Sequence, residues 1–139
     1  TQITRYIAVD GEKKEQSADS CAEMFANNGV IIKNAPVLMV LTYIKGRSGY
    51  ERDGSFTTSK GDRWQMFDAG IASQSFCLAA YEQGLGSVIL GIFDDAKVAS
   101  ILEIPENQEV AALIAVGYPD EEPAAPKRKP VADLLSFIH

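Results

Sequence analysis

The feature that most limits how this sequence can fold is a long stretch without proline, WQMFDAGIASQSFCLAAYEQ at 64–83. Apolar residues fall on nearly every side of a helix over this stretch, which is typical of a helix buried in a core or in a subunit interface. Its small residues Ala69, Gly70, Ala72 and Ser73 would allow another backbone to approach closely. A chain of 139 residues is the length of one domain and has little else to cover such a helix, so we expect a homodimer.

Shorter elements lie on both sides of this helix. The run VLMVLTYI at 37–44 is apolar throughout and should be a strand buried on both faces of a sheet. Strands interleaved with helices indicate one domain in which helices are layered on a sheet. The patterns predict further strands at 4–9, 87–93 and 109–118, and helices at 17–28, 94–104 and 131–138.

The segment GLGSVILGIFDD at 84–95 has three glycines, spaced roughly as in a dinucleotide-binding loop. That loop requires a strand before the glycines and a helix after them, so that the pyrophosphate meets a helix N-terminus. Here the order is reversed, which disfavours a Rossmann domain that binds a pyridine nucleotide. Gly84 is expected to be the left-handed residue that ends the helix, and Gly86 to complete the turn. Gly91, inside the predicted strand, marks either a bulge or the close approach of a ligand.

Composition excludes several classes of function. The net charge of −6 argues against a general nucleic-acid-binding protein, which needs clustered Lys and Arg. The only histidine, His139, is the last residue, which excludes a Ser-His-Asp triad and a zinc site of several histidines. Cys21 and Cys77 lack metal-type spacing and are expected to be reduced thiols of a cytoplasmic protein. No segment has the pattern of a membrane span or a signal peptide.

The segment from Lys45 to Arg63 is polar and rich in glycine. A loop of this length inside a compact domain is usually a lid, a binding loop or disordered, and we expect 45–63 to be flexible. Tyr50, Phe56 and Trp64 lie in it or beside it and could stack on a ligand or simply pack together. The choice of substrate is expected to reside in this loop.

An ordered set of motifs from about Ala35 to Phe137 resembles the FMN-dependent nitroreductase family. The set combines an alanine-rich helix, a glycine turn, an apolar strand, a short helix, a second buried strand and a basic tail. In this sequence its members read NAPVLMV, DAGIASQSF, GLGS, GIFDD, ILEIPE, VAALIAVGYPDEEP and KRKP. The resemblance implies a dimeric α+β protein with a three-layer fold, in which helices flank a central mixed β-sheet.

The resemblance also implies an activity. Family members bind FMN at the dimer interface, take hydride from NADH or NADPH, and pass electrons to nitroaromatics, quinones or similar acceptors. The flavin carries the redox chemistry, so neither a catalytic side chain nor a metal is expected. An alternative of another class is a truncated, non-catalytic module that binds flavin or forms dimers.

The resemblance assigns the flavin contacts to two segments. Ile89, Leu90 and Gly91 would lie beside the isoalloxazine, with a backbone N–H near Gly91 directed at flavin N5. The basic cluster of Lys127, Arg128 and Lys129 would contact the FMN phosphate, with Arg128 as the first choice because a guanidinium pairs with phosphate in bidentate fashion. Read without the resemblance, that cluster is a solvated charged face.

Lys33, before the central strand, is a further candidate, because its positive charge could offset the negative charge on N1 of the reduced flavin.

The N-terminal motifs of the family are missing from this sequence. Family members usually begin with a helix bearing an Arg-Arg-Ser type motif, followed by a Ser/Asn-x-Gln-Pro-Trp type segment, and this sequence has neither. Residues 1–139 are therefore expected to form a single FMN-binding domain without the usual N-terminal helix region, with Thr1 near the start of the following strand.

Overall fold

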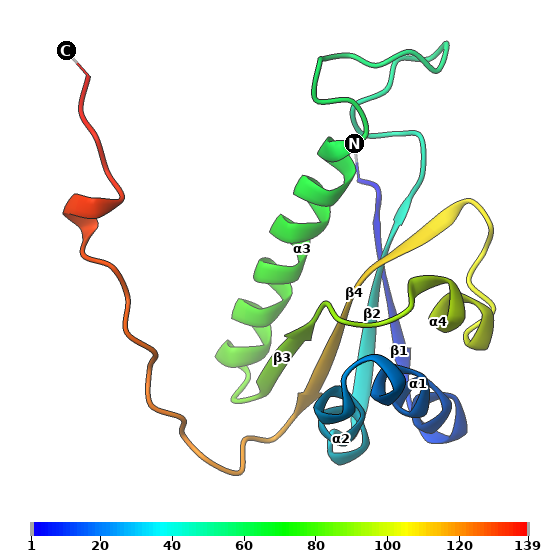
Figure 1. The fold of residues 1–139 in the computed structure, drawn as a ribbon, viewed down its shortest axis with the longest axis vertical. Coiled ribbons are helices and arrows are strands. Elements are labelled where there is room, and N and C mark those ends of the chain that lie inside the picture. Colours follow the sequence, from blue (N-terminus) through cyan, green and yellow to red (C-terminus); the bar gives the residue numbers. More distant parts are fainter. Residues whose placement is uncertain (1, 139) are drawn as a thin grey trace.

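The computed structural model describes residues 2–138 and arranges them in three layers (Figure 1). A four-stranded sheet lies in the middle, with helices α1, α2 and α4 on one face and the long helix α3 on the other. The expected α+β three-layer fold is therefore confirmed. Thr1 and His139, on which two of the sequence-based expectations rest, lie outside the described residues.

The strand order is β1-β2-β4-β3, and each neighbouring pair is antiparallel. The expectation of a mixed sheet is therefore wrong for the described residues. The resemblance implied a mixed sheet, but β4 pairs between β2 and β3 and runs opposite to both. The strands are β1 (Thr4–Val9), β2 (Val37–Ile44), β3 (Gly86–Leu90) and β4 (Gln108–Gly117).

Strand β2 is the buried centre of the molecule, as its continuous apolar run predicts. Leu38 and Val40 pack into the larger core beneath α1, α2 and α4, together with Leu113 of β4. On the opposite face, Leu41 and Tyr43 pack with Ala69 of α3. Because side chains alternate along a strand, only a strand covered on both faces can be apolar at every position.

The helix expected at 17–28 is wrong in its bounds. The chain forms α1 (Gly11–Met24) and α2 (Ala26–Asn34), separated by the extended residue Phe25. The sequence suggested Gly29 as the end of one helix, but Gly29 lies inside α2, where it lets the two helices approach. A Cβ on Gly29 would lie 2.7 Å from the Ala22 Cβ and 2.9 Å from the Ala18 carbonyl oxygen.

The predicted residues at helix ends agree better with the structure for α3 (Arg63–Glu82) and for the start of α4 (Asp95–Ile101). Gly84 has φ +75°, as expected for the left-handed residue after α3. Asp94 caps α4 by accepting a hydrogen bond from the Lys97 N–H at 2.9 Å. The helix expected at 131–138 is wrong, since only the 3₁₀ turn Val131–Asp133 forms there.

Two findings limit the classes of site that the described residues can form. None of the helices within 2–138 is both long and apolar enough to cross a membrane. Nor do the described Cys, Asp and Glu side chains gather into a group of three that could hold a metal ion.

Candidate functional site

A cleft of about 280 Å³ lies between α3 and the sheet, at the point where β3 ends. It brings together the strand segment that the sequence singled out and the small residues of the long helix. Larger hollows exist elsewhere on the surface, but this cleft contains two of the predicted site residues, Ile89 and Gly91. Its lining consists of Met66, Ala69, Gly70, Ser73, Gln74, Ile89, Gly91, Ala111 and Ala112.

The pleat of β3 separates the three predicted strand residues. Leu90 is 4% exposed and packs into the core beneath α4, so its side chain faces away from the cleft. Ile89 is 47% exposed and lines the cleft with Gly91, which directly follows the strand rather than lying inside it. A Cβ added to Gly91 would meet nothing within 4 Å. The packing of this chain therefore does not require a glycine at position 91.

A β-bulge shapes the opposite wall of the cleft. The register between β2 and β4 shifts between Leu41 and Thr42, so that Ala111 of β4 has no partner on β2. Ala111 and Ala112 both line the cleft, although neighbouring residues of a regular strand would point to opposite faces. The bulge thus places two methyl-sized side chains where larger ones would narrow the space.

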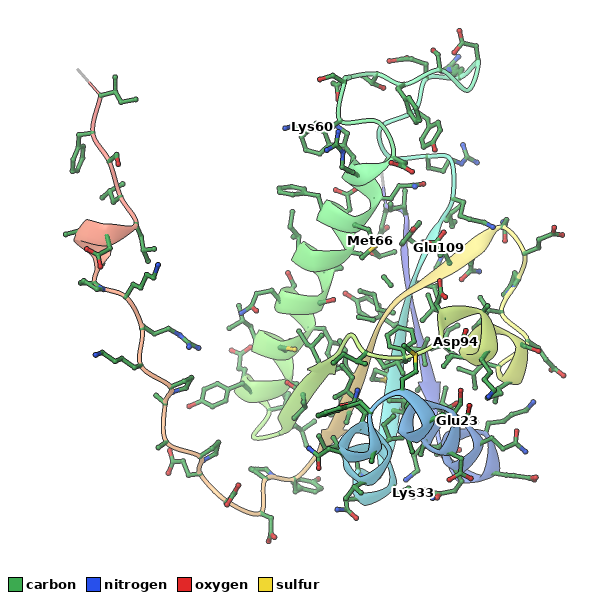
Figure 2. The ribbon with its side chains drawn as sticks, viewed as in Figure 1. Glu23, Lys33, Lys60, Met66, Asp94 and Glu109 are labelled. Atoms are coloured by element: carbon green, nitrogen blue, oxygen red, sulfur yellow. The ribbon has the colours of Figure 1, made fainter. Side chains whose placement is uncertain are left out.

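Beneath this wall lies a partly buried polar pair, Tyr43 and Glu109. Tyr43 is 4% exposed, packs against Ala69 and Ala111, and donates a hydrogen bond from its hydroxyl to Glu109 Oε1. Burial and this hydrogen bond raise the pKa of Tyr43 well above its usual value, so the phenol is neutral. Figure 2 shows Glu109 near the start of β4, and Met66 on the first turn of α3. Because Tyr43 packs against Ala69 and Ala111, which line the cleft, the pair supports the wall of the cleft.

The basic cluster is not brought to the cleft within one chain. Lys127, Arg128 and Lys129 are exposed, and they have no hydrogen bond or ion pair within residues 2–138. They belong to the segment after β4, which leads away from the sheet (Figure 1). In this arrangement the predicted ring contacts and the predicted phosphate contacts are separated.

Lys33 also lies away from the cleft. It is in the last turn of α2, on the far face of the sheet from α3, and its Nζ is 2.6 Å from Asp19 Oδ1 (Figure 2). The hydrogen bond and charge of Asp19 raise the pKa of Lys33. The structure therefore gives Lys33 a surface ion pair and no place beside the candidate site.

The aromatic residues of the long loop pack against one another. Tyr50 and Phe56 form an isolated β-bridge and a tilted ring pair with centroids 5.0 Å apart. Trp64 donates a hydrogen bond from Nε1 to Thr58 Oγ1 at 2.9 Å and meets Phe67 edge-on. Of the two alternatives for these rings, stacking on a ligand or packing together, the structure shows packing together. Flexibility of the loop stays a prediction.

Sequence reasoning missed four residues that line the cleft, namely Met66, Gln74, Ala111 and Ala112. The two alanines come from a strand that was identified correctly, but nothing local marks the bulge that turns both toward α3. The pair of adjacent small residues was the only available signal. Met66 and Gln74 lie eight positions apart on α3, and the apolar pattern of this helix does not show which side faces the sheet.

Several known proteins resemble this chain in sequence and in fold. A family described as "Nitroreductase family" matches residues 1–118. The NADPH-flavin oxidoreductase of Vibrio harveyi is 29% identical to this chain over an alignment 138 residues long. The alignment covers 93% of this chain and 53% of that protein. The chain spans a little over half the length of the first curated relatives that it matches.

Solved structures share the fold. A nitroreductase family protein from Streptococcus pneumoniae superposes with a TM-score of 0.82 at 23% identity, covering 98% of this chain and 79% of that chain. An FMN-dependent nitroreductase from Clostridium difficile superposes with a TM-score of 0.67 at 28% identity, covering 90% of this chain and 68% of that chain.

Proposed function

Because the chain belongs to the nitroreductase family, we propose that it acts as an FMN-dependent oxidoreductase. It would take hydride from NADPH or NADH and deliver electrons to nitroaromatic, quinone or similar acceptors. The observation that carries this proposal is the cleft in which Ile89 and Gly91 face the small residues of α3. FMN supplies the redox chemistry when it is bound, and the chain binds it, orients it and keeps water from its ring.

The residues of the cleft fit a flat aromatic ring. Gly70, Gly91, Ala111 and Ala112 leave space on its walls, and the lining is mostly apolar, as small-molecule sites usually are. Strand β3 is an edge strand, so the backbone groups on its outer side have no partner within the sheet. An N–H of this edge near Gly91 would donate a hydrogen bond to the ring. Arg128, with Lys127 and Lys129 beside it, would hold the phosphate.

The cleft of one chain is small for a whole flavin. Its volume of about 280 Å³ lies at the lower limit of about 300 Å³ for small-molecule sites. A second copy that covers α3 would enclose the ring further. Helix α3 exposes large apolar side chains along its length, among them Phe67 at 57%, Leu78 at 60% and Tyr81 at 81%. We therefore extend the proposal to a homodimer that buries this face.

Sedimentation equilibrium at micromolar concentration should give the mass of a dimer. Phe67→Glu should shift the equilibrium toward monomer, because burying a carboxylate in an apolar interface without a partner is unfavourable. Val30→Glu is the matched control, since Val30 is 55% exposed on α2, on the opposite face of the sheet. A stable monomer of the unmodified protein, or equal effects of both substitutions, would contradict the dimer.

The visible spectrum and steady-state turnover of the purified protein test the proposed function. Protein supplied with FMN should retain bound flavin after gel filtration, and it should oxidise NADPH or NADH when a nitroaromatic or a quinone is present. Flavin binding without turnover of any such acceptor would favour the non-catalytic module instead. Colourless protein that takes up no FMN would contradict both.

A further inference from the structure

The loop between β2 and α3 contains a small hairpin. The Glu51 N–H donates to the Ser55 carbonyl at 2.8 Å, and Tyr50 and Phe56 bridge its two arms. Asp53 accepts hydrogen bonds from the N–H and the hydroxyl of Ser55, at 3.0 and 2.6 Å. The hairpin gives side chains in this part of the loop defined positions.

The side chains of two arginines of this loop have no partner within residues 2–138, unlike those of the arginines near them. Arg5 donates to the carbonyls of Gln2 and Thr4, and Arg63 donates to those of Ser59 and Lys60. The guanidinium groups of Arg47 and Arg52 make no hydrogen bond and no ion pair with any of the described residues. Their guanidinium groups keep all their donors available to a ligand.

Arg47 and Arg52 line the same surface pocket. Its volume is about 340 Å³, and its other lining residues are Gly46, Tyr50 and Glu51. The pocket is lined by two guanidinium groups, of Arg47 and Arg52, and one carboxylate, of Glu51, so its net charge is positive. Over 45–63, five Lys or Arg stand against three Asp or Glu, whereas the whole chain has a net charge of −6. Positive charge is thus concentrated in an otherwise acidic protein, where it would attract an anion.

A partly buried hydrogen bond links this pocket to the first turn of α3. Gln65 is 6% exposed, and its Oε1 accepts the Gly46 N–H at 2.7 Å. The next residue, Met66, lines the cleft. Consecutive residues at the start of α3 therefore bond to the wall of the pocket and line the cleft, which places the pocket near the Met66 end of the cleft.

We infer that Arg47 and Arg52 bind the 2′-phosphate of NADPH and thereby favour NADPH over NADH. This inference rests on the proposed function, which requires a nicotinamide dinucleotide at the cleft. A phosphate monoester carries up to two negative charges, and two guanidinium groups can pair with its oxygens in bidentate fashion. Tyr50, in the same pocket, offers an aromatic face beside which the adenine can lie.

Binding of 2′,5′-ADP tests the phosphate site without any turnover. The double variant Arg47→Gln, Arg52→Gln should bind 2′,5′-ADP about ten- to hundredfold more weakly, since hydrogen bonds to charged groups contribute on the order of 1.5–3 kcal/mol. Binding of 5′-AMP, which lacks the 2′-phosphate, should change little. Lys60→Gln removes a positive charge from the same loop, but Lys60 lies over Trp64 and does not line the pocket, so this control should bind both nucleotides normally.

Turnover separates this inference from the proposed function. In the double variant, kcat/KM for NADPH should fall by a similar factor, while kcat/KM for NADH should stay near that of the unmodified protein. Failure of the unmodified protein to bind 2′,5′-ADP, or equal binding by the double variant, would overturn the phosphate site even if NADH is oxidised. Absence of turnover with either dinucleotide, while 2′,5′-ADP still depends on the two arginines, would overturn the proposed function instead.

Discussion

Gly91→Val should weaken FMN binding roughly five- to hundredfold and leave the stability of the protein without FMN nearly unchanged. A Cβ at position 91 meets no atom of the chain within 4 Å, so a valine should change the free energy of unfolding by no more than about 0.5 kcal/mol. When FMN is bound, the space beside Gly91 would be occupied by the ring. Crowding extra carbon atoms into a filled site costs about 1–3 kcal/mol, which corresponds to a loss of affinity of roughly five- to hundredfold.

Fluorescence titration with FMN and thermal unfolding without FMN measure the two effects. Gly91→Ala adds one carbon atom and should produce a smaller loss of affinity in the same direction. Riboflavin, which has the ring but no phosphate, should lose as much affinity as FMN in both variants. Equal losses of affinity and of stability would mean that Gly91 is needed for folding rather than for the ligand.

Arg128→Ala should weaken FMN binding about ten- to hundredfold, because a hydrogen bond to a charged group contributes on the order of 1.5–3 kcal/mol. Arg128 has no hydrogen bond or ion pair within residues 2–138, so its removal should not affect folding of the chain. If it pairs with the FMN phosphate, the difference between the two proteins should shrink as salt screens the contact. A merely solvated arginine would change binding by a few tenths of a kcal/mol at most.

Riboflavin provides the control for Arg128 as well, with the opposite expectation. Without a phosphate, riboflavin should bind the unmodified protein and Arg128→Ala about equally, whereas Gly91→Val should weaken both ligands. The pair of variants therefore distinguishes a contact with the ring from a contact with the phosphate. If riboflavin loses as much affinity as FMN in Arg128→Ala, the arginine holds the C-terminal segment in place and does not touch the cofactor.

Local signals in the sequence account for most of the elements. The strand Val37–Ile44 and the helix Arg63–Glu82 follow from apolar runs whose length and periodicity leave little choice. The sequence predicts Gly84 after one helix and Asp94 or Asp95 at the start of another, because such ends need a left-handed residue or a side-chain acceptor nearby in the chain; Gly84 and Asp94 take these places. Each of these features depends on residues that lie within a few positions of one another in the chain.

Contacts between distant parts of the chain decided the rest. Gly29 reads locally as a helix end, yet it is held inside α2 because α1 packs against it. Strand β4 pairs between β2 and β3 and makes the sheet antiparallel, and the bulge in β4 turns Ala111 and Ala112 together toward α3. The sequence by itself determined most of the segments that become helices and strands, because the hydrophobic pattern and the end residues act locally. Only the tertiary structure decided which strands pair and which side chains share a cleft, because strand partners and register depend on burying faces that lie far apart in the chain.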